Sequence, residues 1–440
     1  MNKLILVALF LYSNFVLKGQ NNIDSLFKDG ILALSANQFD KALTNFNQII
    51  NLQPSNADAY YNRGITYSKK NNINPAIENY SKAIEYNPKK IEAYINRGSA
   101  YCELKNYKQA LQDYDNALLL NSEMPEIYNN RGYLFSLQNS HKEAIQDFDK
   151  AIKINKKYFK AYINKAFSLS TMSEHLLAIE VLNELIYLNP DNAAAYVNRA
   201  SEYKLLNNLK NSICDYDKAL TLEPRDENVL FLRAVLRDEL GNDIEAIEDF
   251  SAIIKLNPLN AQAYYHRALA EYDIPNYKAV VDDCSSAIQL KSDYWKAFII
   301  RGNAFDFLNK YEDALKDYNK AIELNPRAND AFEQRAIARL SKNDISGALS
   351  DFSKAIIINP GNFNLIEKRA NLRAATKDYK AAIEDYSKIL ELTPNSFKIL
   401  LARAELLILI GKKEQACMDF RKAEALGNGA ALSKIIFYCN

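Results

Sequence analysis

The sequence has few of the residues that build turns, disulfide frameworks and metal sites. Its 440 residues include 12 glycines, 11 prolines, 5 cysteines, 3 histidines and 1 tryptophan. So few glycines and prolines favour helices joined by short turns over a sheet protein. Five cysteines are too few for a disulfide framework in a chain of this length. His141, His175 and His266 have no cysteine or carboxylate at ligand spacing, so no metal site is expected.

The sequence also lacks an excess of charge of either sign. Its 55 basic residues nearly balance its 54 acidic ones, and no basic run lies on one face. Binding to nucleic acid or to an anionic membrane surface is therefore not expected. The chain has no phosphate-binding glycine loop, no nucleophile motif and no Ser/His/Asp set outside the repeat pattern described below. We therefore expect neither an enzyme nor a bound cofactor.

The first twenty residues differ from the rest of the chain. Lys3 precedes an apolar run from Leu4 to Leu17, which residues 18–20 follow. This order is typical of a secretory signal peptide over residues 1–19, with cleavage expected after Gly19. The run is shorter than the roughly 20 residues that cross a bilayer, so no membrane insertion is expected after cleavage; an uncleaved anchor is the alternative. The mature protein is expected to be exported and to be periplasmic, associated with the cell envelope or secreted.

The sequence repeats itself every 34 residues from residue 23 to residue 430. Residues 60–64 (YYNRG) align with residues 94–98 (YINRG), and the match recurs without insertion or deletion. The twelve repeats are residues 23–56, 57–90, 91–124, 125–158, 159–192, 193–226, 227–260, 261–294, 295–328, 329–362, 363–396 and 397–430.

Each repeat combines small and large residues at fixed positions. Position 8 is glycine or alanine in all twelve repeats, and position 20 is alanine or serine except at Val280. Position 24 carries an aromatic ring or leucine except at Cys284, and position 32 is proline in eight repeats. Small residues let two helices approach closely, the large side chain fills the remaining space, and the proline ends the second helix. Each repeat is therefore expected to fold as an antiparallel helix pair.

This pattern resembles the tetratricopeptide repeat family over residues 23 to about 430. Two positions depart from the family: tyrosine often stands at position 4 instead of tryptophan, and arginine at position 7 instead of leucine. The resemblance implies an all-α fold, a right-handed α-solenoid superhelix of about twelve 34-residue helix pairs. Because the last repeat would otherwise expose its stacking face, residues 431–440 are expected to form a C-terminal capping helix.

Positions 7 and 23 vary together, except that repeat 2 is half changed, with Arg63 and Asn79. Repeats that lack arginine at position 7 also lack aspartate at position 23, as Lys165 and Val181 show. The two positions face each other across a helix hairpin, so we expect an ion pair that holds the two helices in register. A row of arginines offered to an acidic ligand is the alternative. The expected structural pairs include Arg97 with Asp113, Arg131 with Asp147, and Arg301 with Asp317.

The first helices of a helix-pair solenoid line its concave side, where positions 2, 5, 6, 9 and 13 form a stripe. Position 6 is asparagine in repeats 2 to 6, and aromatic side chains stand nearby. A side-chain amide offers a donor and an acceptor together, which matches the peptide group of an extended chain. Two interpretations are open: a groove that binds a peptide backbone, and a solvated polar face inherited by duplication. The groove residues are Asn62, Asn96, Asn130, Asn164, Asn198, Tyr61, Tyr133, Phe167 and Tyr265.

The stripe changes from repeat 7 onward. Position 6 becomes Leu232, His266 and then, in repeat 11, Lys368. Position 11, often aromatic in earlier repeats, becomes charged in four later ones. We hypothesise two adjoining binding segments, one neutral and one charged or apolar. The charged residues at position 11 are Arg237, Glu271, Arg339 and Arg373.

Two cysteines stand close to the end of the chain. Cys439 belongs to the expected capping helix, and the register brings it near Cys417 of the preceding helix. In an oxidising compartment these two residues can form a disulfide that holds the cap, and two free thiols are the alternative.

Taken together, the sequence predicts a non-catalytic scaffold that binds a protein or an extended peptide in the concave groove of an exported solenoid. A structural spacer and a glycan-binding envelope protein are the alternatives.

Overall fold

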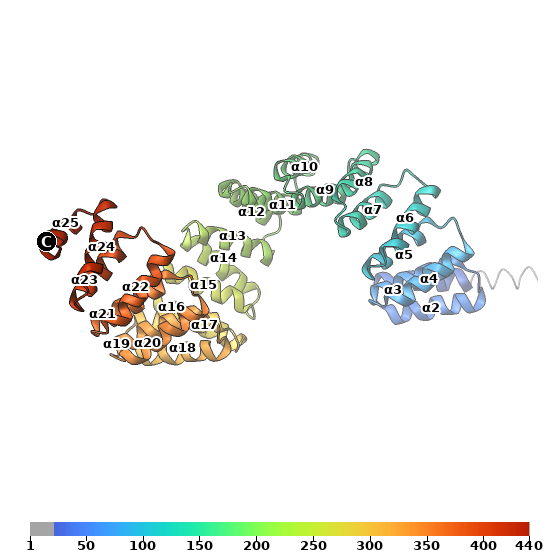
Figure 1. Ribbon diagram of the computed structural model, residues 1–440. Helices are drawn as coiled ribbons and strands as arrows, with labels where there is room; N and C mark the ends of the chain where they lie inside the picture. Colours follow the sequence, from blue (N-terminus) through green and yellow to red (C-terminus); the bar gives the residue numbers. More distant parts are fainter. Residues whose placement is uncertain (1–21, 440) are drawn as a thin grey trace, which may run out of the picture. The chain divides into compact units, whose positions relative to one another are not determined.

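The computed structural model describes residues 22–439, and this part of the chain contains helices and no strand (Figure 1). The predicted signal peptide, residues 1–19, lies outside the described residues. The chain divides into two compact units, Met1–Pro224 and Arg225–Asn440, which we call the N-terminal and C-terminal blocks. None of the helices described is both long enough and apolar enough to span a membrane.

The helices of the N-terminal block alternate between the first and second helix of each repeat. Residues 22–35 are helical and open the series. The helices that follow are α2 Phe39–Leu52, α3 Ala57–Lys69, α4 Ile73–Tyr86, α5 Ile91–Glu103, α6 Tyr107–Leu120, α7 Pro125–Leu137, α8 His141–Ile154, α9 Phe159–Thr171, α10 His175–Leu188, α11 Ala193–Leu205 and α12 Leu209–Leu222.

The C-terminal block continues the same alternation and ends with a single additional helix. Its helices are α13 Glu227–Glu239, α14 Asp243–Leu256, α15 Ala261–Asp273, α16 Tyr277–Leu290, α17 Trp295–Phe307, α18 Tyr311–Leu324, α19 Asn329–Ser341, α20 Ile345–Ile358, α21 Phe363–Ala375, α22 Tyr379–Leu392, α23 Phe397–Leu409, α24 Lys413–Ala425 and α25 Gly429–Tyr438.

Packing is local in both blocks. Each helix packs against the next one along the chain, from α2 to α12 and from α13 to α25. The first helices of successive repeats also touch one another, in the order α3, α5, α7, α9 and α11 in the N-terminal block. This arrangement confirms the predicted all-α solenoid of helix pairs, and it gives the N-terminal block one face made only of first helices. We call it the first-helix face.

The small and large positions of the repeat meet in the core of each helix pair. Tyr114 is 2% exposed, and a Cβ added to Gly98 would lie 2.8 Å from its Cε1 atom. Position 8 is therefore small because the ring at position 24 occupies the adjoining space. Where that ring is a tyrosine, position 9 can supply a partner for its hydroxyl group: Tyr318 donates to Asn303 at 2.8 Å.

Two kinds of turn separate the helices. Position 15, between the helices of one repeat, adopts a left-handed conformation, with φ of 58° at Asn37, 61° at Asn71 and 60° at Asn139. Asparagine tolerates this conformation better than most residues, which accounts for its frequency there. The second helix ends at position 30, as α4 does at Tyr86, and the proline at position 32 follows in the turn.

The C-terminal helix α25 begins two residues before the boundary expected at residue 431. The side-chain oxygen of Asn428 accepts hydrogen bonds from the backbone N–H groups of Ala430 and Ala431 at 3.1 and 3.3 Å, and so caps the helix. Ala431 is fully buried against the preceding helices. The helix therefore covers the last repeat, as a cap must.

Candidate functional site

The arginines at position 7 bind the aspartates at position 23 of their own repeats. Arg97 donates from Nε and Nη2 to the two carboxylate oxygens of Asp113, at 2.8 and 2.7 Å. The same paired bonds join Arg131 to Asp147 and Arg301 to Asp317. The aspartate side chains are only 4–8% exposed, so each pair lies inside its repeat. The hydrogen bonds from Arg131 to Asp147 raise the pKa of this arginine.

The same guanidinium groups also reach the second helix of the preceding repeat. Nη1 of Arg97 donates to Ser81 at 2.9 Å, and Nη1 of Arg131 to Asp115 at 2.7 Å. These partners stand at position 25, which is serine, asparagine or aspartate in the first eleven repeats. One arginine thus connects three helices and links successive repeats. The sequence contains this row of acceptors, but their role depends on how the repeats stack.

Three arginines at position 11 bind the same aspartates from a second side. Arg339 donates to Asp351 at 2.8 Å, and Arg373 donates to Asp385 at 2.8 Å. Arg237 binds the corresponding aspartate of repeat 7 in the same way. These guanidinium groups therefore form ion pairs within their own repeats. They do not form the charged binding segment that the sequence suggested.

Repeat 8 carries a glutamate, Glu271, at position 11, where repeats 7, 10 and 11 carry arginine. Glu271 is 8% exposed, and its Oε2 atom is buried without a hydrogen-bond partner among the described residues. Burial and, to a smaller extent, the nearby charge of Asp283 raise the pKa of Glu271 to about 7. Repeat 8 therefore contains a buried carboxyl group where other repeats add a second arginine.

The asparagine row lies on the first helices of the N-terminal block, and its members differ in their surroundings. Asn62 is 9% exposed and donates to the backbone oxygen of Asp58 in its own helix at 2.8 Å. Asn198 also donates within its helix, to the oxygen of Ala194 at 2.7 Å. Asn62 is thus a buried member of the row, and the surface available to a ligand begins at Asn96.

The middle of the row is joined across repeats by side-chain hydrogen bonds. Asn96 donates to the hydroxyl oxygen of Tyr61 at 3.1 Å. Asn164 donates to Asn129 at 2.9 Å, and Asn129 donates to Asn130 at 3.2 Å. Each asparagine has two N–H donors and two lone pairs, so these bonds leave part of the capacity of the partly exposed Asn96, Asn130 and Asn164 for a ligand, whereas Asn129 is buried. Asn129, at position 5, was not part of the predicted row.

A pocket of about 440 Å³ lies beside Asn130. The side chain of Tyr133 is 50% exposed and that of Leu137 40% exposed, so both offer apolar surface to a ligand. The lining residues are Ser99, Cys102, Glu103, Lys105, Tyr107, Tyr114, Asn130, Tyr133 and Leu137. The pocket therefore combines one asparagine of the row with apolar surface from α5, α6 and α7, which suits a side chain of a bound polypeptide.

The aromatic residues predicted for the groove are divided between the two blocks. Tyr61, Tyr133 and Phe167 belong to the N-terminal block, as the asparagines do, and Phe167 is 62% exposed. The ring of Tyr61 lies 4.7 Å from the ammonium group of Lys90, and burial raises the pKa of Tyr61 to about 12. Tyr265 belongs to the C-terminal block, and the structure brings Tyr61 and Tyr133 together with asparagines of the row.

In the C-terminal block, salt bridges join the first helices of the last repeats and the cap. Lys368 lies 2.6 Å from Glu333 of the preceding repeat, and Lys398 lies 2.6 Å from Glu367. Lys434 of α25 pairs with Glu405 at 3.0 Å. Exposed pairs of this kind contribute about 1 kcal/mol or less each to stability.

One group of carboxylates in the described residues has the spacing of metal ligands. Oxygen atoms of Asp238, Asp243 and Asp273 lie within 4.8 Å of one another. Burial, with the charges of the other two aspartates, raises the pKa of Asp238 to about 6. Because acidic side chains gather at surfaces without binding a cation, this spacing does not define a metal site.

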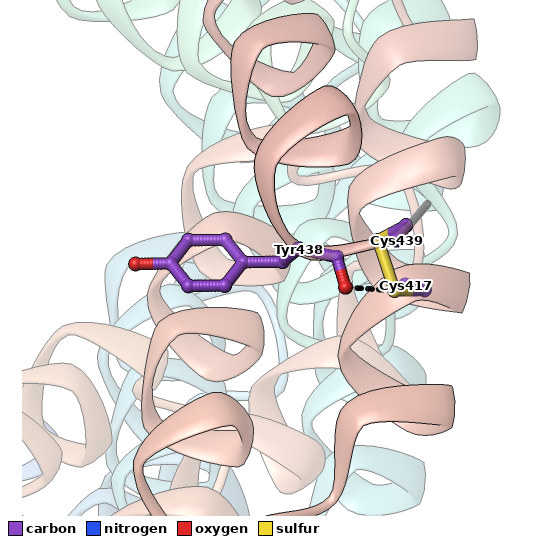
Figure 2. The surroundings of a disulfide bond; sticks show 3 residues. All are labelled: Cys417, Tyr438 and Cys439. Atoms are coloured by element: carbon purple, nitrogen blue, oxygen red, sulfur yellow. Dashed lines mark hydrogen bonds between the residues drawn. A yellow bond between two sulfur atoms is a disulfide. The ribbon is translucent and has the colours of Figure 1, made fainter.

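The cap is attached by a disulfide between Cys417 and Cys439, which joins α24 to the end of α25 (Figure 2). The side chains of Ile435 and Tyr438 pack against the core of repeat 12 beside this bond. The structure thus brings together the two cysteines that the sequence placed near each other, while Cys102, Cys214 and Cys284 are free thiols.

We expect the mature protein, denatured without reductant, to show three reactive thiols, and five after reduction. Replacing Cys439 with serine should destabilise the docked cap by about 3 kcal/mol, because the crosslink closes a loop of about twenty residues. Hydrogen exchange in α25 would measure the effect, with Cys214→Ser as a control that leaves α25 unchanged. Five reactive thiols before reduction would contradict the bond.

Comparison with known families fits this geometry. Models described as tetratricopeptide repeat match residues 57–90, 91–124, 125–158 and 295–327, residues 231–293, and residues 159–192, 193–226 and 366–396. A further model, described as TPR repeat, matches residues 33–71. The fold is that of an all-α helical-repeat protein. The chain belongs to the tetratricopeptide repeat family.

Several solved structures align with this chain at low sequence identity. A tetratricopeptide repeat protein from Parabacteroides merdae is 22% identical, with 57% of this chain and 99% of that chain covered and a TM-score of 0.45. Yeast Tom70 is 18% identical, with 95% of each chain covered and a TM-score of 0.41. At these values the likenesses carry no argument on function. A comparison with curated protein sequences gives no significant match.

Proposed function

We propose that the protein is a non-catalytic scaffold that binds an extended polypeptide on the first-helix face of the N-terminal block. The observation that carries this proposal is the row of partly exposed asparagines Asn96, Asn130 and Asn164, of which Asn130 lines the pocket at Tyr133. Amide side chains that recur once per repeat can each bond a peptide group of an extended chain, and the pocket can receive a side chain. Tetratricopeptide repeats generally bind proteins or peptides, which supports the same function.

We further propose that the protein works outside the cytoplasm. The order of charged and apolar residues at positions 1–20 is that of a signal peptide. The disulfide between Cys417 and Cys439 supports this location, because such bonds persist in oxidising compartments.

The triple variant Asn96/Asn130/Asn164→Ala should lose at least about tenfold in affinity for an extended peptide, since three hydrogen-bonding amides are removed at about 0.5–1.5 kcal/mol each. The probe is a peptide selected from a random library on the mature protein, and binding is measured by fluorescence anisotropy. Lys368→Ala, which breaks only the exposed pair with Glu333, is the matched control and should leave the affinity unchanged.

Melting curves of both variants separate lost binding from lost structure. An equal loss of affinity in the triple variant and in Lys368→Ala would contradict a binding site at the asparagine row. A selected peptide whose affinity does not change in the folded triple variant would also contradict it, and would favour a structural spacer or another surface.

A further inference from the structure

Repeat 2 departs from the ion-pair ladder at position 23, where it carries Asn79 instead of aspartate. Arg63 donates from Nε to the side-chain oxygen of Asn79 and from Nη1 to that of Asn47, both at 2.6 Å. Both partners are neutral amides, and Arg63 makes no ion pair with a described residue. Every other arginine at position 7 has a carboxylate partner; these arginines are Arg97, Arg131, Arg199, Arg233, Arg267, Arg301, Arg335, Arg369 and Arg403.

Because Asn79 replaces aspartate, the Nη2 group of Arg63 has no hydrogen-bond acceptor at position 23. In repeat 3, Nη2 of Arg97 donates to Asp113 at 2.7 Å. Asn79 offers no second oxygen, and its own amide group donates to the backbone oxygen of Pro75 at 2.7 Å. Nη2 of Arg63 therefore lacks the acceptor that its counterparts have. Burial lowers the pKa of Arg63, but a guanidinium group keeps its proton at neutral pH, so the charge persists.

Arg63 lines a pocket of about 580 Å³, together with Tyr60, Asn79 and Ser81. The guanidinium carbon lies 5.1 Å from the centre of the Tyr60 ring, which holds the plane of the charged group in place. The volume is sufficient for a small acid or for an acidic side chain. None of the residues of the asparagine row lines this pocket, so the site is separate from the proposed peptide-binding face.

The remaining charges around the pocket do not neutralise Arg63. Lys82 is paired with Glu85 at 2.7 Å, so these two side chains cancel each other. Glu78, the other acidic residue of the lining, is exposed at the surface. An exposed carboxylate is screened by water more strongly than the half-buried guanidinium group, so the inner end of the pocket favours an anion.

We propose that this pocket binds a carboxylate group, which accepts from Nη2 of Arg63 as an aspartate does in the other repeats. A carboxylate fits because planar guanidinium groups bind it through hydrogen bonds strengthened by charge. The carboxylate belongs either to a small carboxylic acid or to an acidic residue of a polypeptide. The inference does not depend on the proposed function.

The test follows the Nε–H resonance of Arg63 in ¹⁵N-labelled mature protein, assigned by its loss in Arg63→Lys. Sodium acetate is titrated at constant ionic strength against sodium chloride. We expect a saturable shift with acetate and none with chloride. Asn79→Asp, which restores the aspartate of the other repeats, should weaken acetate binding at least about tenfold, since it supplies the carboxylate from within. Asn72→Asp adds the same charge at an exposed position and should leave the affinity unchanged.

A second titration identifies the source of the carboxylate. A polypeptide ligand is indicated if a blocked Gly-Glu-Gly peptide binds more tightly than acetate and its Gly-Gln-Gly counterpart causes no shift. A small acid is indicated if acetate binds as tightly as the Gly-Glu-Gly peptide. Acetate that shifts the resonance no more than chloride does would overturn the proposal. So would equal acetate affinity in Asn79→Asp and the unmodified protein.

Discussion

Replacing Asp385 with alanine is expected to lower the free energy of unfolding by about 3–5 kcal/mol, because the change leaves buried arginine charge without a partner. The side chain of Asp385 is 1% exposed and binds Arg369 through both carboxylate oxygens. Arg373 donates to the same carboxylate at 2.8 Å. Urea unfolding of the C-terminal block, followed by circular dichroism, measures the loss.

The control is Glu384→Ala, which removes the same charge from an exposed position one residue away in α22. A surface change of this kind should alter stability by no more than about 0.5 kcal/mol. A loss below 1 kcal/mol in Asp385→Ala would mean that the pair behaves as a solvated surface pair, and the ladder would then not hold the repeats in register.

The second large effect is expected from Phe352→Ala, at about 3–5 kcal/mol. Phe352 is 2% exposed and packs in one cluster with Ala336, Ala348 and Leu365 of the next repeat. Its removal leaves a cavity between helices that the small residues at positions 8 and 20 cannot fill. Unfolding in urea, under the conditions used for Asp385→Ala, gives the comparison.

Ile357→Ala in the same helix is the matched control, because this side chain is 79% exposed and its truncation removes little buried surface. Its effect should stay within about 0.5 kcal/mol. Equal effects of the two substitutions would contradict the assignment of position 24 to the core of the helix pair.

Most of the fold was predictable from the sequence because the same pattern of residues occurs in all twelve repeats. The small residue at position 8 and the ring at position 24, represented by Gly98 and Tyr114, predict a close helix pair, and the structure shows the ring against the glycine. The joint variation of positions 7 and 23 indicated which side chains face each other. The residue pattern of a single repeat is thus sufficient to predict the contacts within that repeat.

The candidate site was less predictable, because it depends on neighbouring repeats. The sequence did not distinguish Asn62, which is 9% exposed, from Asn164, which is linked to the preceding repeat through Asn129. It also assigned Arg339 and Arg373 to a groove, whereas both bind buried aspartates. A side chain at a given position points inward or outward according to the partner that adjacent helices present, and the repeat pattern does not contain that information.

The sequence by itself determined the helices, the turns, the pairing of helices within a repeat and the residues that form its core, since all of these depend on contacts within 34 residues of chain. Only the tertiary structure decided which asparagines are accessible, how the position-7 arginines reach the preceding repeat, and that Arg63 is bonded to neutral amides of two repeats. The physical reason is that these features depend on the stacking of one helix pair on the next. Stacking places side chains from separate repeats within hydrogen-bond distance.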